Sequence, residues 1–157
     1  MKPLRITKQS TNQVLVERSF DAPVALLWRA YTEPELVKQW MTGPPGHTMP
    51  VCEMDVRTGG KFRWVWKMPE GEMAAYGVFR EVIERERLVH TETFEEWPDN
   101  HALITTTFDK YGGGTLLSVL IEYDSEETRD AVLSTGMADG MEMSYSNLDT
   151  LLKKNRS

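Results

Sequence analysis

Hydrophobic and polar residues alternate most regularly within residues 61–68, whose sequence is KFRWVWKM. Every second position there holds a large apolar side chain: Phe62, Trp64, Trp66 and Met68. The positions between them are cationic, except for Val65. Because successive side chains of a β-strand point to opposite faces, the segment predicts a strand with one bulky apolar face. Such a row either fills a core or lines a binding cavity.

The same two-residue period predicts six further strands, separated by turn residues. With residues 61–68 included, the predicted strands are 12–20, 51–57, 61–68, 74–83, 87–95, 101–109 and 115–123. Short glycine-rich loops such as residues 111–114 join several of them, so neighbouring strands are expected to be antiparallel. Residues 1–12 are polar, and we expect them to be loosely held.

Helical patterns occupy two regions of the chain. Two short helices are predicted between the first two strands, over residues 24–31 and from the Thr32-Glu33-Pro34-Glu35 start signal to about Trp40. Asp21 is the expected N-cap of the first, with Pro23 in its first turn. A long helix is predicted over residues 125–154, where Ser125 is followed by acidic residues and the end carries lysines, as the helix dipole favours.

Two glycines interrupt the apolar face of this long helix, Gly136 and Gly140. Each costs about 1 kcal/mol of helix stability relative to alanine. We therefore expect the glycines either to let the helix approach the sheet closely or to leave space beneath it.

Five stretches, taken in order, carry a resemblance to a known family. They are RSFDAPVALLWRAYTEPELVKQW (18–40), DVRTGGKF (55–62), YGVFREVIERERLVHTETF (76–94), GGGTLLSVLIEY (112–123) and TGMADGMEMSYSNLDTLL (135–152). This set resembles the family named for the C-terminal domain of the Hsp90 ATPase activator, within the START and Bet v 1-like superfamily. The chain departs from the family pattern at residues 84–86, where a proline is usual, and at Met137 and Met141, where tryptophans are common.

The resemblance implies one START/Bet v 1-like domain over residues 1–157. The implied fold class is α+β, a helix-grip fold in which a strongly bent antiparallel sheet of about seven strands wraps around the long C-terminal helix. Such proteins commonly hold an apolar cavity between sheet and helix. A hydrophobic or aromatic small molecule would bind there, and the residues expected to contact it are Phe62, Trp64, Trp66, Tyr76, Met137, Met141 and Tyr145. Tyr76 and Tyr145 would supply hydroxyl groups that orient the ligand.

Composition narrows the choice of partners and compartment. The net charge of -6 and the pI of about 5.1 argue against nucleic acid, because binding to phosphates needs clustered cations. No apolar run is long enough to insert across a bilayer, and the N-terminus lacks the apolar segment of a secretory signal. Cys52 has no second cysteine with which to form an internal disulfide, which favours the cytoplasm.

Catalytic patterns are weak, and we predict no catalytic residue, metal ligand or cofactor. The three histidines, His47, His90 and His101, do not have the spacing of metal ligands. His90 and Glu92 share a strand position parity with Leu88 and Phe94, so parity alone does not decide whether they face the cavity. If either did, desolvation would shift its pKa and make acid–base chemistry available.

Ligand binding is therefore the leading functional prediction. One alternative is an interaction protein that acts like a co-chaperone of Hsp90, which the family name suggests. Another is a small enzyme of the cyclase, dehydratase or hydrolase type that uses the same cavity. Exposed strand edges allow a homodimer without requiring one.

Overall fold

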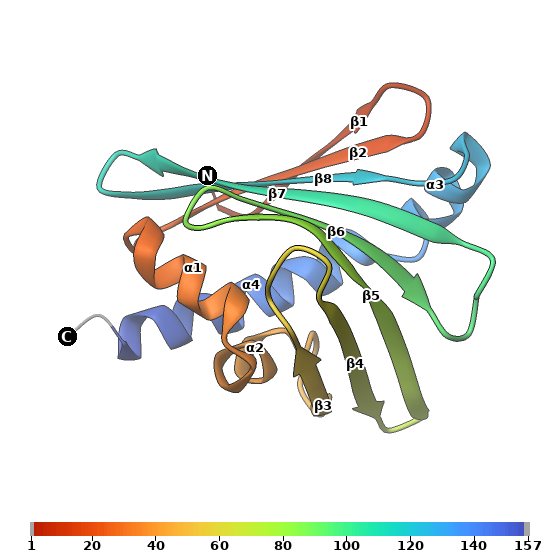
Figure 1. Ribbon diagram of the computed structural model, residues 1–157, viewed down its shortest axis with the longest axis horizontal. Coiled ribbons are helices and arrows are strands. Elements are labelled where there is room, and N and C mark those ends of the chain that lie inside the picture. The colour runs from red at the N-terminus through yellow and green to blue at the C-terminus, as the bar shows by residue number, and fades with distance from the viewer. Residues whose placement is uncertain (1, 156–157) are drawn as a thin grey trace.

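The computed structural model describes residues 2–155, which form eight strands and four helices (Figure 1). The strands are β1 (Arg5–Gln9), β2 (Gln13–Phe20), β3 (Thr48–Met54), β4 (Lys61–Met68), β5 (Gly71–Ile83), β6 (Arg87–Phe94), β7 (His101–Tyr111) and β8 (Gly114–Glu122). The helices are α1 (Val24–Thr32), α2 (Pro34–Trp40), α3 (Glu126–Leu133) and α4 (Met137–Lys154).

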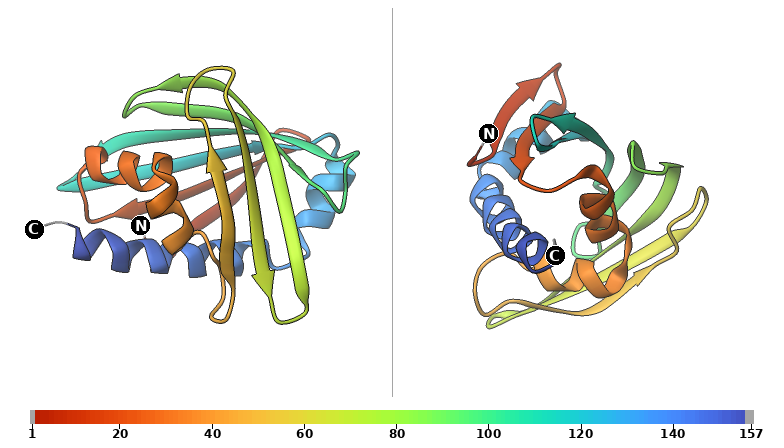
Figure 2. Two further views of the ribbon diagram at one scale, coloured as in Figure 1. Left: turned by 60° about the horizontal axis from the view of Figure 1, so that its bottom comes forward. Right: turned by 90° about the vertical axis from the view of Figure 1, so that its left-hand side faces the viewer.

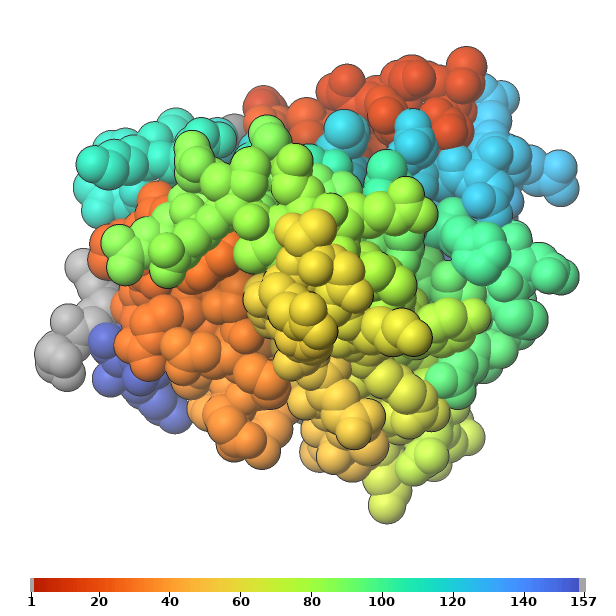
Figure 3. Space-filling view, viewed as in Figure 1, coloured from red at the N-terminus to blue at the C-terminus, as the bar shows by residue number. Residues whose placement is uncertain are grey.

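All eight strands belong to one antiparallel sheet with the order β1-β2-β8-β7-β6-β5-β4-β3. The sheet bends strongly, and α4 runs along the inside of the bend (Figure 2). The short helices α1 and α2 lie beside the C-terminal half of α4, and in the space-filling view their orange surface adjoins the yellow connection between β3 and β4 (Figure 3). This arrangement confirms the predicted α+β helix-grip fold.

The face of the sheet turned toward α4, called the inner face below, carries most of the core. Its side chains can be followed from strand to strand through the register, since paired residues point to the same side. One such row runs Val14, Ile121, Ile104, His90 and Phe79, across β2, β8, β7, β6 and β5. The apolar members of this row are buried, as alternation along each strand predicts.

A buried arginine joins the inner face to α4. Arg18 of β2 is 2% exposed, and its guanidinium donates hydrogen bonds of 2.8–3.0 Å to the carboxylates of Glu142 and Asp149. Its charged carbon also lies 4.8 Å from the centre of the Phe20 ring, a cation–π distance. We call Arg18, Glu142 and Asp149 the Arg18 clamp. It fixes the height and rotation of α4 over the sheet.

The clamp also changes the acidity of Glu142. Burial by itself would raise the pKa of this carboxyl group, but the hydrogen bonds from Arg18 and from the backbone N–H of Leu4 outweigh it. The pKa of Glu142 therefore lies below its ordinary value of 4.5. The carboxylate form that the clamp needs is thus the favoured one in the folded protein.

The structure differs from the sequence prediction at the N-terminus. Residues 1–12 were expected to be loosely held, but Arg5–Gln9 form the edge strand β1, which pairs with β2. Ile6 is the one apolar side chain of β1, and it lies opposite Val16. Because β1 is an edge strand and mostly exposed, its sequence shows no clear alternation of apolar and polar residues.

The predicted long helix over 125–154 is also divided. α3 ends at Leu133 and α4 begins at Met137, and Gly136 between them has φ +83°, a conformation that glycine adopts without strain. Gly136 therefore lies between two helices, as the residue before α4, and does not interrupt the face of one long helix. The expected cap at Ser125 is confirmed, since its hydroxyl accepts a hydrogen bond of 3.1 Å from the N–H of Thr128.

Two further expectations, for Gly140 and for the cap of α1, can be compared with the structure. Gly140 lies within α4, and a Cβ added to it would meet no other atom within 4 Å, so it leaves open space on the helix. At α1, Pro23 and not Asp21 occupies the position before the first helical residue. Asp21 instead accepts a hydrogen bond from Lys2.

Candidate functional site

The aromatic row of β4 lies on the inner face, as its alternation predicted. Phe62 and Trp64 are buried, with ring centres 4.3 Å apart, while Trp66 is only partly buried. The indole N–H of Trp66 donates a hydrogen bond of 2.8 Å to the carbonyl of Met41, just beyond α2. Trp66 thus has a fixed orientation, with part of its ring open to solvent.

Two predicted ligand-contact methionines, Met137 and Met141, lie in the N-terminal half of α4, the helix that runs along the inside of the bent sheet (Figure 2). Met137 and Met141 are partly buried against the core. The hydroxyl of Tyr123, which follows β8, lies 3.7 Å from the sulfur of Met137. These flexible side chains therefore border the inner face where it is not fully covered.

Tyr145, in contrast, belongs to the packed core near α1 and α2. Its ring lies edge-on to Phe20 and is stacked near Trp40, with centres 5.5 and 6.2 Å away. Its hydroxyl is 3.5 Å from that of Tyr31, and burial raises its pKa to about 12. The expectation that Tyr145 offers a free hydroxyl to a ligand does not hold, because α1 and α2 cover it.

Tyr76 lies on the opposite face of the sheet from the aromatic row. It pairs with Arg63 of β4 and with Thr93 of β6, and 40% of its surface is exposed. The expectation that Tyr76 lines the interior is therefore wrong. The face on which Tyr76 lies is set by the register between β4 and β5. This register places Ala75, and not Tyr76, beside Trp64.

The question that parity left open is answered by the sheet register. His90 pairs with Phe79 on β5 and with Ile104 on β7, so its side chain lies on the inner face, as does that of Glu92. The ring of His90 is surrounded by Phe62, Phe79 and Trp64, with ring centres 5.3, 6.0 and 6.1 Å away. His90 and Glu92 are thus polar groups inside an aromatic environment.

Three buried polar atoms in this region make no hydrogen bond within residues 2–155. They are the indole nitrogen of Trp64 and both ring nitrogens of His90. The nearest charged group, Glu92 Oε1, is 3.7 Å from His90 Nε2, which is too long for a hydrogen bond. A buried polar atom without a partner costs about 1–3 kcal/mol, so these three atoms need an explanation beyond the packing around them.

Tyr123 completes this polar group. Burial, together with the negative charge of nearby Glu92, raises the pKa of its phenol to about 12. We call Trp64, His90, Glu92 and Tyr123 the inner polar cluster. Its members come from β4, from β6 and from the residue after β8, so the bend of the sheet brings them together.

A row of aromatic rings connects this cluster with the surface. Ring centres are 6.0 Å apart between Trp64 and Trp66, 6.2 Å between Trp66 and Phe94, and 6.4 Å between Phe94 and Trp97. Trp64 is 6% exposed, whereas Trp97, in the connection between β6 and β7, is 59% exposed. Sequence reasoning did not select Phe94 or Trp97, although Phe94 shares the parity of His90 and Glu92.

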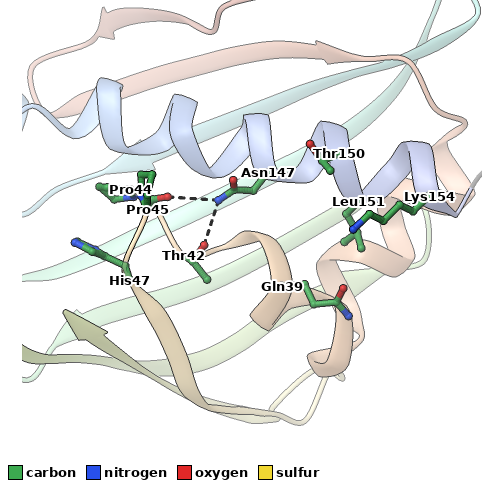
Figure 4. Close-up of a pocket in the computed structure, with 10 residues that line it drawn as sticks. Gln39, Thr42, Pro44, Pro45, His47, Asn147, Thr150, Leu151 and Lys154 are labelled. Atoms are coloured by element: carbon green, nitrogen blue, oxygen red, sulfur yellow. Dashed lines mark hydrogen bonds between the residues drawn. The ribbon is translucent and has the colours of Figure 1, made fainter. Parts of the chain in front are cut away.

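Two surface hollows lie away from the inner polar cluster. One, of about 340 Å³, lies between the loop after α2 and the C-terminal half of α4 (Figure 4). There Asn147 donates hydrogen bonds to Thr42 and to the carbonyl of Gly43, so its amide already holds the loop in place. The other, of about 1000 Å³, is an open depression on the outer face around Tyr76.

The structure offers little support for other chemistry within residues 2–155. No three His, Cys, Asp or Glu side chains in that range are grouped to hold a metal ion. Burial raises the pKa of the Cys52 thiol to about 11, which opposes formation of a nucleophilic thiolate. No helix in the same range has the length and apolar character needed to cross a membrane.

Known proteins share this fold and part of this sequence. A protein from Rhodobacter sphaeroides has a crystal structure that matches with a TM-score of 0.90 and 32% identity, over 96% of this chain and 99% of that one. Protein Ms6760 from Mycobacterium smegmatis matches with a TM-score of 0.85 and 26% identity, over 96% and 97% of the two chains. An uncharacterized protein of Schizosaccharomyces pombe is 29% identical over 114 residues, which are 72% of this chain but 30% of that protein.

The family model described as "Activator of Hsp90 ATPase homolog 1-like protein" matches residues 21–153, from the start of α1 almost to the end of α4. The matched region therefore contains the aromatic row, the inner polar cluster and both methionines of α4. On this evidence the chain belongs to the family of activator of Hsp90 ATPase homolog 1-like proteins.

Proposed function

We propose that the protein binds a hydrophobic or aromatic small molecule between the inner face of the sheet and the N-terminal half of α4. The residues proposed to contact it are Phe62, Trp64, Trp66, Phe94, Met137 and Met141. Phe94 replaces Tyr76 and Tyr145 of the sequence prediction, because the former lies on the inner face and the latter two do not border this region.

The observation that carries the proposal is the combination of partly exposed apolar side chains with unpartnered polar atoms on one inner surface. Trp66, Phe94 and Met137 remain partly exposed although they face inward. A filled core buries such residues completely and pairs its polar atoms, as the packing around Tyr145 does. Apolar walls with few polar groups are typical of small-molecule sites.

The test is binding of a neutral fluorescent naphthylamine, N-phenyl-1-naphthylamine, combined with native mass spectrometry of gently purified protein. Ala102 lies beside Glu92 on the inner face, so an Ala102→Phe substitution places a ring where the ligand is proposed to bind. We expect this variant to lose dye binding while its unfolding free energy stays within about 1 kcal/mol of wild type, because the added ring would occupy the space proposed for the ligand.

Tyr76→Phe on the outer face is the control, and its dye binding should match wild type. If Ala102→Phe is instead destabilised by about 1–3 kcal/mol, and wild type binds no dye, the inner surface is a filled core and the proposal is wrong.

An enzymatic role remains an alternative prediction, favoured by the inward positions of His90 and Glu92. It would be tested through loss of any discovered turnover in Glu92→Gln. Interaction with Hsp90, a homodimer and a cytoplasmic location also remain predictions.

A further inference from the structure

We infer that the ligand is an aromatic alcohol, a neutral ring system whose hydroxyl group accepts a hydrogen bond from Trp64 Nε1 and donates one to the ring of His90. The inference rests on the proposed function, because it names the chemical class of the molecule bound at the same site. It follows from the donors and acceptors of the inner polar cluster and from the charge beside them.

The first step concerns the hydrogen bonds that the cluster offers. The indole of Trp64 can only donate, so its buried N–H needs an acceptor. A neutral histidine donates from one ring nitrogen and accepts at the other. The carboxylate of Glu92, 3.7 Å from Nε2, favours the tautomer with the proton on Nε2 and leaves Nδ1 of His90 as an acceptor.

The cluster therefore presents one donor and one acceptor, and the two rings that carry them have centres 6.1 Å apart. Among the polar groups of a ligand, a hydroxyl is the smallest that accepts one hydrogen bond and donates another. A carbonyl or ether oxygen would satisfy Trp64 and leave His90 without a partner.

The second step concerns charge. A ligand carboxylate would have to lie close to Glu92, whose negative charge already opposes ionisation of the Tyr123 phenol. A ligand ammonium group would suit Glu92 but would leave the indole N–H of Trp64 without an acceptor. The surroundings therefore favour a neutral group that both accepts and donates.

The third step concerns the body of the ligand. The rings of Trp66 and Phe94 are partly exposed on the inner face and lead outward to Trp97. Flat aromatic ligands gain from stacked and edge-on contacts with such rings, in addition to the area that they bury. The row runs from the surface to the cluster, so a ligand stacked along it would have its hydroxyl group at the inner end.

Three probes of similar size separate these contributions. In 2-naphthol the hydroxyl can accept and donate, in 2-methoxynaphthalene the oxygen can only accept, and 2-methylnaphthalene can do neither. Their affinities are measured by equilibrium dialysis at pH 7, where 2-naphthol is neutral. We expect 2-naphthol to bind about tenfold more tightly than 2-methylnaphthalene, as two net hydrogen bonds between neutral groups predict, with 2-methoxynaphthalene between them.

Two variants test whether His90 and Trp64 cause the preference for 2-naphthol. His90→Leu should bring the affinity for 2-naphthol down to that for 2-methoxynaphthalene, and Trp64→Phe should weaken both oxygen-containing probes. In each variant the affinities of the two oxygen-containing probes are compared with that of 2-methylnaphthalene, which makes neither hydrogen bond and therefore reports the change in apolar contact alone. Tyr76→Phe removes a hydroxyl from the outer face and should change none of the three affinities.

The possible failures are distinguishable. Equal binding of all three probes would overturn the hydroxyl inference and leave the binding site standing. Equal binding of 2-naphthol and 2-methoxynaphthalene would refute the hydrogen bond to His90. If none of the probes binds, the proposed function fails and the inference fails with it.

Discussion

Replacing Arg18 by methionine tests whether the Arg18 clamp holds α4 on the sheet. Methionine keeps most of the apolar stem of the side chain but removes the charge and all hydrogen bonds to Glu142 and Asp149. The two carboxylates, which lie on the same face of α4, would then lose the cation that they share, and Asp149 would keep only Lys2, 3.8 Å away. We expect the folded protein to be destabilised by this loss of pairing.

The magnitude follows from burial. Removing one partner of a buried ion pair costs about 3–5 kcal/mol, because the remaining charge is left in a poor environment. The side chains of Glu142 and Asp149 are 27% and 24% exposed, so water can partly solvate them and the lower end applies. We therefore expect a loss of about 3 kcal/mol in unfolding free energy, which for a domain of this size lowers Tm by about 6–12 °C.

The assay is urea unfolding followed by tryptophan fluorescence, with thermal unfolding by circular dichroism as a second measurement. Arg63→Met is the matched control, since Arg63 makes the same two-point contact with Glu95, at 2.9 and 3.2 Å, but on the surface. This control should lose far less stability than Arg18→Met, because solvent screens an exposed ion pair. If Arg18→Met loses no more than Arg63→Met, the reasoning from burial is refuted.

Three further predictions concern the same fold. The pKa of Glu142 is lowered from 4.5, chiefly through Arg18, so the clamp contributes its full stability above pH 4.5 and loses it as the pH falls through the lower pKa of the folded state. The difference in unfolding free energy between wild type and Arg18→Met should therefore shrink in that pH range. A difference that stays constant would contradict the assignment. Gly140→Ala should stabilise the protein by about 1 kcal/mol, because Gly140 is helical and has open space beside it. Gly136→Ala should destabilise the protein by about 1–2 kcal/mol, because alanine is strained at φ +83°. Urea unfolding of both variants would show whether the two changes have opposite signs. The Cys52 thiol, with a pKa of about 11 from burial, should react with iodoacetamide at pH 8 far more slowly in the folded protein than in denaturant, and equal rates would show that it is accessible.

Local alternation was sufficient to predict most of the sheet. β4 was predicted with its observed bounds, because large apolar residues alternate with cations along its whole length. β1 was missed because an edge strand needs few apolar residues, and Ile6 alone gives no period. The break at Gly136 was missed because the apolar stripe continues on both sides of it, and only the backbone angle distinguishes a turn from a helix.

The candidate site was only partly predictable, because its composition depends on how strands pair. Phe62, Trp64 and Trp66 follow from the alternation of one strand, but the faces of Tyr76 and His90 depend on the register between strands. Tyr145 was misplaced for a different reason. Helical spacing puts it on the stripe of Met137 and Met141, but α1 and α2 cover that end of the helix.

The order of strands in the sheet has a consequence for how the chain reaches its folded form. β3 to β8 each pair with a neighbour in sequence, so these hairpins can assemble while the protein is being synthesised. β2 forms a hairpin with β1 but joins the rest of the sheet only through β8, and this second pairing joins Gln13 to Glu122 across 109 positions. A two-stranded hairpin is marginal on its own, and distant pairings form slowly. We therefore expect β2 to enter the sheet after the strands that follow it in sequence, and pulse-labelled hydrogen exchange should find the amides of β2 protected after those of β5 and β6.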